Sequence, residues 1–480
     1  MIRPGLTVES RMIATPWSRI VRGIGLGQYP IDHDPVLAAR LRETVDQLAA
    51  RVPGDAYTSF ARRTTNLILN VTEAGGRLPF PRLEADLDAV LAELRTVRNP
   101  YYRVTGGAIL LDALAKLEVP RRLIIGGGRD LPAEVLAGVD EIEPDRIEDE
   151  NSGRHGDYER LSAYTAAFLA HGQWDLAGRL TEGRNYVSEA LHLLDSVPAP
   201  FFRGRGGSML LSVAYLLGYG ELVKAGGRDW IAETLDHLDR ADELNLPPAF
   251  PQPMSPAFGK IYPLLTMLNT VAMSGIGAHL THRHDRLAEL RALWGQITPV
   301  ERTHMGLYYL VALHNLGRLR DEIPDVRAFV TALVGQWRDI DPGENYFLHG
   351  IAYPYLIMTA LFTGQRELIT ESMVDRLVDS FPSLDRTDTD RINRPYPFAY
   401  AITALSELGA TDRLFAPHPR YGGSTPMAWV IGQLPAQPSS RLYMLDHALI
   451  SSALRMRGAA AGQTGLYQRF RFDRGLFSVS

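Results

Sequence analysis

Residues 99–117 read NPYYRVTGGAILLDALAKL, and residues 345–364 read NYFLHGIAYPYLIMTALFTG. Each stretch opens with Asn, aromatic residues and a basic side chain, and then continues as an apolar helix with almost no polar face. A helix that is apolar on all sides must be covered on every side by other elements. The two stretches therefore predict buried helices, and the arrangement of the chain must provide that cover.

Similar apolar helices recur along the chain. We predict them over 158–170, 206–220, 262–273, 304–317, 346–362, 397–408 and 442–454. Between them lie segments with apolar residues at spacings of three and four and with charges on the opposite face. These amphipathic segments cover 37–52, 82–97, 229–244, 285–297, 325–337 and 368–381. The pattern predicts alternate outer, amphipathic helices and inner, buried helices.

The polar starts of the inner helices are 41 to 58 residues apart, which is typical of a repeated helical hairpin. An open solenoid would leave one side of the inner layer in water, whereas a closed ring covers that side. The sequence therefore predicts an all-α protein, an α/α toroid, with an open solenoid and a multi-domain helical bundle as alternatives. We expect an N-terminal arm over 1–33, one toroid domain over 34–460 and a C-terminal tail over 461–480.

The composition narrows the classes of function. The chain of 480 residues is 45% hydrophobic and 22% charged, as globular proteins are, and it contains no cysteine, which excludes disulfides, thiolate nucleophiles and Cys-ligated metals. It has no signal-peptide core and no run of about 20 apolar residues, so we expect a cytoplasmic location and no membrane span. A net charge of −5 without a Lys/Arg block argues against a nucleic-acid partner. A small-molecule substrate is the expected partner, and a homo-oligomer stays open.

If the inner helices are parallel, their N-terminal ends gather on one rim. Helix N-termini present unpaired N–H groups and a partial positive charge, so additional cations there predict a site for an anion. Ion pairs between these arginines and nearby carboxylates are the alternative, and it stays open. The predicted substrate-binding residues are Tyr101, Tyr102, Arg103, Arg154, Tyr158, Arg203, Arg205, Arg302, Tyr346, Tyr353, Arg394, Tyr396 and Arg441. Further rim residues are Lys260, Tyr262, Glu301, His304, Tyr443, Asp446 and His447.

Aromatic residues follow the inner helices below this rim. They either pack in the core or line a cavity, where aromatic faces would stabilise a cation. The glycines at 106, 107, 204, 206 and 207 either leave space beside the rim or let helices pack closely. The aromatic residues are Tyr164, Phe168, Tyr215, Tyr219, Tyr308, Tyr309, Tyr353, Tyr355, Phe398 and Tyr400.

Acid–base chemistry needs carboxyl or imidazole groups in a perturbed environment. The predicted catalytic residues are Asp388 and Asp390, just before one inner helix, and Asp157 and His349, near the starts of two others. The DTDR stretch that contains the first two is similar to the aspartate-rich DxDD-type motif of protonating isoprenoid cyclases, which have α/α barrels. Arg391 stands where that motif has a third acid. The resemblance implies that Asp388 or Asp390 is a proton donor.

Two other motifs are interpreted as structural. His279, His282 and His284 lack an HExxH framework, so we predict a solvent-exposed connection and no metal site. RLIIGGG (122–128) is a short strand candidate before a glycine-rich turn, but it lacks the Lys-Ser/Thr of a P-loop, which favours a structural turn. No cofactor is predicted, and a requirement for a divalent cation such as Mg stays open.

These features predict an enzyme with an aromatic-lined cavity and a cationic rim. Its substrate would be an amphipathic anionic small molecule, and its reaction an acid-initiated cyclisation or isomerisation of an isoprenoid-type compound. One alternative is a hydrolase, lyase or epimerase of acidic carbohydrates, with carboxylates about 5 Å apart for retention or about 6.5–9.5 Å apart for inversion. The other alternative is a non-enzymatic helical-repeat scaffold that binds a peptide or protein.

Overall fold

The computed structural model of the chain describes residues 35–75, 78–144, 156–197, 200–240, 255–339, 346–384 and 395–434, with six further positions between 443 and 453. Almost all regular structure in these ranges is helical, so the all-α prediction is confirmed. The predicted arm over 1–33 and the predicted tail over 461–480 lie outside the described residues. Within the described part of the chain, no helix has the length and apolar character needed to cross a bilayer.

One set of helices forms an inner layer in which each helix contacts the next. Most of their residues are buried, as the apolar stretches predict. The inner layer consists of α4 (Ala56–Glu73), α6 (Pro100–Lys116), α8 (Gly156–Gln173), α10 (Pro200–Leu216), α12 (Pro256–Ser274), α14 (Pro299–Asn315), α17 (Tyr346–Phe362) and α20 (Pro395–Leu408).

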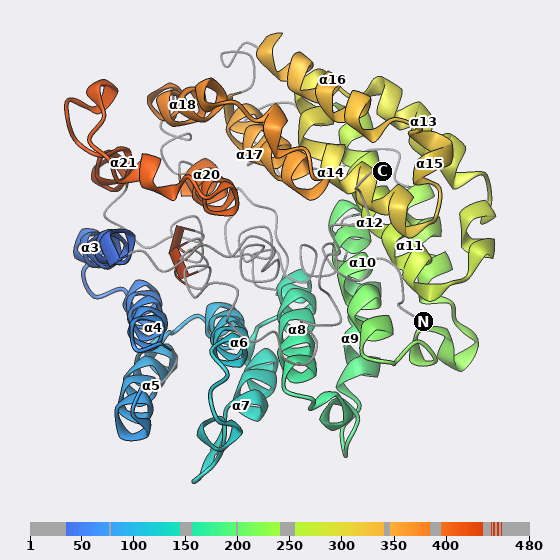
Figure 1. Cartoon of the computed structure of the whole chain (residues 1–480). Helices are drawn as coiled ribbons and strands as arrows, with labels where there is room; N and C mark the ends of the chain where they lie inside the picture. The colour runs from blue at the N-terminus through green and yellow to red at the C-terminus, as the bar shows by residue number, and fades with distance from the viewer. Residues whose placement is uncertain are drawn as a thin grey trace.

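The remaining helices pack against this layer from outside, and Figure 1 shows them at the periphery of the view. The outer layer consists of α3 (Pro35–Arg51), α5 (Phe80–Thr96), α7 (Leu131–Ala137), α9 (Tyr186–Ser196), α11 (Trp230–Asp239), α13 (Arg286–Gln296), α15 (Leu319–Glu322), α16 (Val326–Asp339), α18 (Glu371–Ser380) and α21 (Pro426–Gln433). Short 3₁₀ helices join the layers: η1 (Arg121–Leu123), η2 (Gly138–Glu141), η3 (Ala177–Leu180), η4 (Leu222–Gly227), η5 (Gly277–Thr281), η6 (Arg366–Leu368), η7 (Phe381–Leu384), η8 (Thr411–Leu414) and η9 (Pro419–Tyr421).

A polar residue followed by proline starts three of the inner helices. Asn99, Ser255 and Thr298 each accept a backbone N–H of the first turn, and the proline that follows occupies the first helical positions without losing a hydrogen bond. Glu301 completes a capping box with Thr298 and also accepts the Ser255 N–H at 2.8 Å, which joins the starts of α12 and α14. These polar starts therefore fix where the inner helices begin.

The neighbouring inner helices α10 and α12 run in the same direction. Phe201, near the start of α10, has its ring centroid 5.8 Å from that of Tyr262, in the first half of α12. Near the other ends of the same two helices, the hydroxyl oxygens of Ser212 and Thr270 are 2.9 Å apart. Early positions thus meet early positions and late positions meet late ones, which is the parallel arrangement that the sequence predicts.

The first and last described helices of the outer layer lie side by side. Figure 1 shows α21 beside α3, and the two are in contact. Arg51, the last residue of α3, donates its Nε–H to the carbonyl of Leu434, just after α21, at 2.8 Å. In the inner layer, the Thr58 hydroxyl of α4 donates to the Asp446 carboxyl at 3.1 Å. Residues almost 400 positions apart are therefore neighbours.

Glycines of the inner helices mark points of close packing. A Cβ atom added at Gly107 would lie 2.5 Å from Cγ2 of Val135. One added at Gly204 would lie 2.5 Å from Cδ2 of Leu238 and 2.9 Å from Cβ of Pro263. Of the two interpretations of the inner-helix glycines, close packing is the one that these positions fit.

The glycine-rich stretch after α6 forms a small hairpin. Strands β1 (Ile125–Gly126) and β2 (Arg129–Asp130) pair antiparallel, with Ile125 opposite Asp130. The turn residues Gly127 and Gly128 have φ angles of 59° and 86°, which only glycine adopts without strain. The stretch is thus a tight turn between layers, in agreement with the structural interpretation.

Candidate functional site

Two of the predicted rim arginines bind carbonyl groups at the ends of outer helices. Nη1 of Arg103, in the first turn of α6, donates to the carbonyl of Val97 at 3.1 Å, directly after α5. Nε of Arg302, in the first turn of α14, donates to the carbonyl of Trp294 at 3.2 Å, in the last turn of α13. In both cases the guanidinium satisfies carbonyls that a helix end leaves free.

A third rim arginine meets a carboxylate at an equivalent place. Nη2 of Arg203, near the start of α10, lies 3.5 Å from the carboxylate of Asp195, in the last turn of α9. Burial lowers the pKa of the Arg203 guanidinium. The first of the three arginines, Arg103, likewise pairs with a carboxylate, that of Glu141. The C-terminal end of a helix attracts cations, so these arginines stabilise the outer helices. Arg103 and Arg203 thus form the ion pairs of the alternative interpretation. The contacts of Arg103, Arg203 and Arg302 give no support to a site for an anionic ligand.

Arg205 instead contacts an aromatic ring of the inner layer. Its guanidinium carbon lies 5.5 Å from the ring centroid of Tyr262, within reach of a cation–π interaction. Of the predicted substrate-binding arginines that the structure describes, Arg205 is thus the one placed against the aromatic inner layer.

Four tyrosines of neighbouring inner helices form a continuous row, which we call the tyrosine row: Tyr262 (α12), Tyr308 (α14), Tyr355 (α17) and Tyr400 (α20). The hydroxyl oxygens are 3.5 Å apart for Tyr262 and Tyr308 and 2.9 Å apart for Tyr308 and Tyr355. The rings of Tyr355 and Tyr400 have centroids 5.5 Å apart. All four are buried. Parallel helices thus place aromatic faces and hydroxyls side by side.

A buried histidine accompanies the tyrosine row. His304 stands one turn before Tyr308 in α14, and its ring centroid lies 4.3 Å from that of Tyr355 and 6.3 Å from that of Tyr262. An imidazole and phenolic hydroxyls are groups that give and accept protons. His304, Arg205 and the tyrosine row together form the candidate site, which we call the aromatic site.

A second group of interest surrounds a buried carboxyl. Asp446 is 2% exposed, and the loss of solvation together with the nearby Asp55 carboxylate raises its pKa well above 3.8. Its carboxyl accepts the hydroxyl of Thr58, while the hydroxyl of Tyr443 donates to Asp55 at 3.0 Å. The ring of Tyr57 lies 4.3 Å from that of Tyr443. Burial and the neighbouring carboxylate thus both favour the protonated form of the Asp446 carboxyl.

The predicted tyrosines near the helix starts lie in the core. The ring of Tyr102 is 4.6 Å from that of Tyr443 and 5.3 Å from that of Tyr101. The ring of Tyr158 is 4.8 Å from that of Phe202. The predicted catalytic Asp157 is also buried, and its carboxylate lies 3.6 Å from Nη1 of Arg160.

Tyr353 packs between the two layers. Its ring stacks on that of Trp337 in α16 with centroids 3.9 Å apart, and its hydroxyl donates to the carbonyl of Met373 in α18. Burial raises the pKa of this hydroxyl. Of the two interpretations of the aromatic residues, core packing describes Tyr353.

The side chains of the remaining predicted residues lie outside the described part of the structure. Tyr346 and His349 lie in α17 and Tyr396 lies in α20, with no description of their side chains. The others lie outside the described residues: Asp388, Asp390, Arg154, Arg394 and Arg441.

A sequence pattern that hydrophobic periodicity does not reveal recurs at the starts of four outer helices. A basic residue is followed by Asp or Asn, three further residues and Glu, as in RDLPAE (129–134), RNYVSE (184–189), RDWIAE (228–233) and HDRLAE (284–289). The second residue of each pattern caps the helix with its side chain. This signal is visible in the sequence once the four stretches are aligned.

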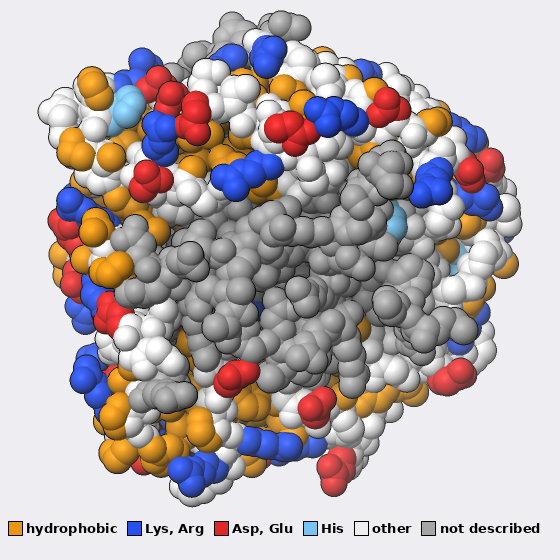
Figure 2. Space-filling model, in the orientation of Figure 1, with side chains coloured by type: hydrophobic (Ala, Val, Ile, Leu, Met, Phe, Trp, Pro, Cys, Tyr) orange, Lys and Arg blue, Asp and Glu red, His pale blue; other side chains and the backbone are white. Residues whose placement is uncertain are grey.

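In the first three copies, the first arginine of the pattern joins its helix to an acid of the preceding outer segment, and in the fourth copy Arg286 does so. We call each of these four groups an outer clamp. The arginine of the second and third copies also binds the Glu of its own pattern. The pairs are Arg129–Asp88, Arg184–Asp140 with a contact of 2.9 Å, and Arg228–Asp195 with a contact of 2.8 Å. Figure 2 accordingly shows acidic and basic side chains close together along the periphery of the face it presents.

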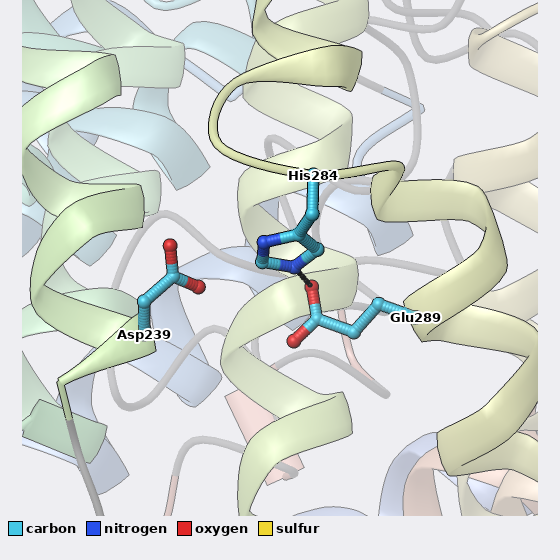
Figure 3. Close-up of side chains that lie close together, drawn as sticks. All are labelled: Asp239, His284 and Glu289. Atoms are coloured by element: carbon cyan, nitrogen blue, oxygen red, sulfur yellow. Dashed lines mark hydrogen bonds and ion pairs between the residues drawn. The ribbon is translucent and has the colours of Figure 1, made fainter.

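The fourth clamp has His284 in place of arginine. Nε2 of His284 lies 2.8 Å from Glu289, and Arg286 binds Asp239 at 2.7 Å. Figure 3 shows Asp239, His284 and Glu289 pointing toward one another. His282 and His279 also bind acids of α11 or its start, and His279 is buried. The prediction of a solvent-exposed connection therefore fits His284, which is exposed, and fits His282 in part, but it does not fit His279, which is buried against Asp229.

The fourth clamp contains residue types that bind divalent metals. Ligand atoms of Asp239, His284 and Glu289 lie within 4.8 Å of one another. However, the guanidinium of Arg286 lies among them, 3.1 Å from Glu289 and 3.1 Å from Nε2 of His284, and this side chain is 1% exposed. A buried cation already neutralises both carboxylates, so the group does not fit a resident metal ion.

The chain matches no protein-family model, no curated protein and no solved structure. Its function therefore has to follow from the chemistry of its own residues.

Proposed function

We propose that this chain is an α/α toroid enzyme that converts an amphipathic, anionic, isoprenoid-type molecule by acid-initiated cyclisation or isomerisation. Closure of the toroid is supported by the contacts of Arg51 with Leu434 and of Thr58 with Asp446, which join segments near both described ends of the chain. The parallel inner helices support a single aromatic lining. An open arc would leave these two contacts unexplained.

The observation that carries the proposal is the burial of the Asp446 carboxyl beside the Asp55 carboxylate, which raises the pKa of Asp446. An ordinary aspartate is ionised at neutral pH and has no proton to donate, whereas a raised pKa keeps the proton on the acid. Asp446 is 2% exposed and lies near Tyr57, whose ring packs against that of Tyr443. Asp388 and Asp390 are the donors that the sequence predicts, and they lie outside the described residues.

The reaction needs no redox partner. The acid proton adds to one carbon of a substrate double bond, the π electrons form the new C–H bond, and the neighbouring carbon becomes a carbocation. Aromatic faces such as those of the tyrosine row stabilise this cation. A base then removes a proton from an adjacent carbon, the C–H electrons form the new double bond, and the formula of the substrate is unchanged. The donor regains its proton from solvent.

Arg205 and His304 supply the remaining roles. The cation of Arg205, held over Tyr262, suits the anionic head group of the substrate. His304 is buried among the rings of the tyrosine row and is our candidate for the group that accepts the final proton.

The test is conversion of geranyl, farnesyl and geranylgeranyl diphosphate in D₂O, with products analysed by mass spectrometry. We expect a product that carries one deuterium at a former double-bond carbon. Asp446→Asn keeps the shape of the side chain but has no acidic proton, so it should lower the rate by about 100-fold or more.

Tyr309→Phe is the matched control. Tyr309 lies in α14 next to Tyr308, but it stacks on Trp294 of the outer layer at 4.2 Å, away from the aromatic site. Its variant should keep full activity. A product without deuterium, or an Asp446→Asn variant as active as the unaltered chain, would contradict the proposed acid.

A further inference from the structure

A cavity of about 570 Å³ lies between α11, α12 and α13, beside the fourth clamp. The side chains of Arg240, Lys260 and Arg286 contribute positive charge to its lining. Leu238, Pro263 and Leu264 contribute an apolar surface. None of these residues belongs to the aromatic site, so the cavity is a separate place on the molecule.

The acids that line this cavity are already neutralised. Asp236 binds Arg283 at 3.0 Å, and that contact lowers the pKa of Asp236 to about 2. Asp239 binds Arg286, which also reaches Glu289. The negative charges of the lining are therefore all engaged by cations of the same wall.

Two cations of the lining have no carboxylate partner among the residues that the structure describes. Lys260 and Arg240 have exposed side chains, and neither forms an ion pair with any residue that the structure describes. Arg240 donates its Nε–H to the carbonyl of Asp236, which leaves the two NH₂ groups of its guanidinium for a ligand. The other two lysines of the chain differ in this respect, because Lys116 and Lys224 each have a carboxylate partner at 3.5 Å.

A third donor of the wall has no acceptor among the described residues. The Nε–H of Arg286 is buried and makes no hydrogen bond to any of them, and the side chain is almost fully enclosed. In the second and third clamps this position is Tyr186 or Trp230, whose ring stacks against the arginine of the clamp. The cavity therefore lies beside the copy of the pattern in which the cation of Arg286 replaces this aromatic residue.

We propose that this cavity binds a small phosphate monoester. Lys260 and Arg240 hold the phosphate, which carries close to two negative charges at neutral pH and so matches two unpaired cations. Leu238, Pro263 and Leu264 hold a short apolar part of the same molecule. Arg286 adds positive charge to the wall and balances the charges of Asp239 and Glu289. The site is independent of the proposed enzymatic activity.

The test uses the small number of lysines. The lysine amines are converted to dimethylamines with ¹³C-formaldehyde and a borohydride reductant, which keeps their charge, and each gives one ¹³C signal assigned by Lys→Arg variants. Phenyl phosphate should shift the signal of Lys260 in a saturable way and leave those of Lys116 and Lys224 in place. Inorganic phosphate should act at about tenfold higher concentration, because it lacks the apolar part.

Variants of the unmodified chain provide the second readout. Lys260→Gln and Arg240→Gln should each weaken phenyl phosphate binding about tenfold or more in calorimetry, since each removes a charge-assisted contact. Lys224→Gln is the control and should bind as the unaltered chain does. Absence of saturable binding would overturn the proposal, and so would equal affinities of all four proteins or equal shifts of the three lysine signals. Benzoate binding as tightly as phenyl phosphate would overturn the phosphate assignment.

Discussion

A carboxyl group that stays protonated inside a protein makes stability depend on pH in a direction opposite to that of an ion-paired acid. The folded pKa of Asp446 is raised, so between its ordinary value near 3.8 and the folded value the folded state binds more protons than the unfolded state. The contribution of Asp446 to stability is full below pH 3.8 and is lost as the pH rises through the folded pKa.

Asp446→Asn cannot titrate, and it therefore isolates this effect. Compared with the variant, the unaltered chain should lose stability above about pH 4 by up to about 1.4 kcal/mol per pH unit until the folded pKa is reached. Urea unfolding of both proteins at pH 5 and pH 8 measures the difference. A difference that is the same at both pH values would show that Asp446 is ionised in the folded protein.

The outer clamps give a second prediction for single residues. Arg286 has a side chain 1% exposed and holds two carboxylates, whereas the side chain of Arg228 is 32% exposed. Arg286→Met should cost about 3 kcal/mol, because it leaves partly buried acids without a cation. Arg228→Met should cost about 1 kcal/mol, since water screens its pairs. Chemical denaturation of both variants tests this order, and equal losses would contradict it.

Among single residues, some of the candidate site could be predicted from the sequence. Tyr308, Tyr355 and Tyr400 belong to the aromatic set, and His304 and Asp446 belong to the rim set, because helical periodicity alone places them on buried helices. The direction of the rim arginines could not be predicted. A guanidinium near a helix start reaches either the interior of the layer or the end of the preceding helix, and only the packing of both layers decides.

At the scale of helices, the alternation of the two layers follows from hydrophobic periodicity, but the predicted spans do not include α4, α7, α9, α15 or α21. In α4, buried threonines conceal the apolar face. The hydroxyls of Thr64 and Thr72 donate to carbonyls one turn earlier, at 2.9 and 2.8 Å, and this allows them to be buried. A scale that counts threonine as polar does not register such a face. The outer clamps were missed because their partners lie in different helices, 33 to 47 residues apart.

Close packing between helices predicts opposite effects of the same substitution at two glycines. Gly204→Ala places a methyl group 2.9 Å from the rigid ring of Pro263 and 2.5 Å from Leu238, and should cost about 1–3 kcal/mol. Gly295→Ala, in α13, meets no atom within 4 Å and should add about 0.5–1 kcal/mol through helix propensity. Thermal unfolding of the two variants measures both. Stabilisation by Gly204→Ala would show that space is present beside α10.

For the whole molecule, the absence of cysteine allows a direct test of closure. Glu43 in α3 and Gly432 in α21 are exposed, and the two helices are in contact. Spin labels on cysteines placed at these two positions should give one narrow distance distribution, set by an interaxial distance of about 8–10 Å and the label arms. Labels at Glu43 and Gly335, in α16, provide the comparison and should give a longer distance. A broad or long distribution for the first pair would favour an open arc.

The outer clamps also mark equivalent points along the chain, at Arg129, Arg184, Arg228 and His284. Each clamp joins an outer helix to the outer segment before it, so a segment that runs from one such point to the next could be copied or removed without changing the kind of junction at either end. Gene duplication in whole segments would then lengthen or shorten both helical layers in steps of one helical hairpin.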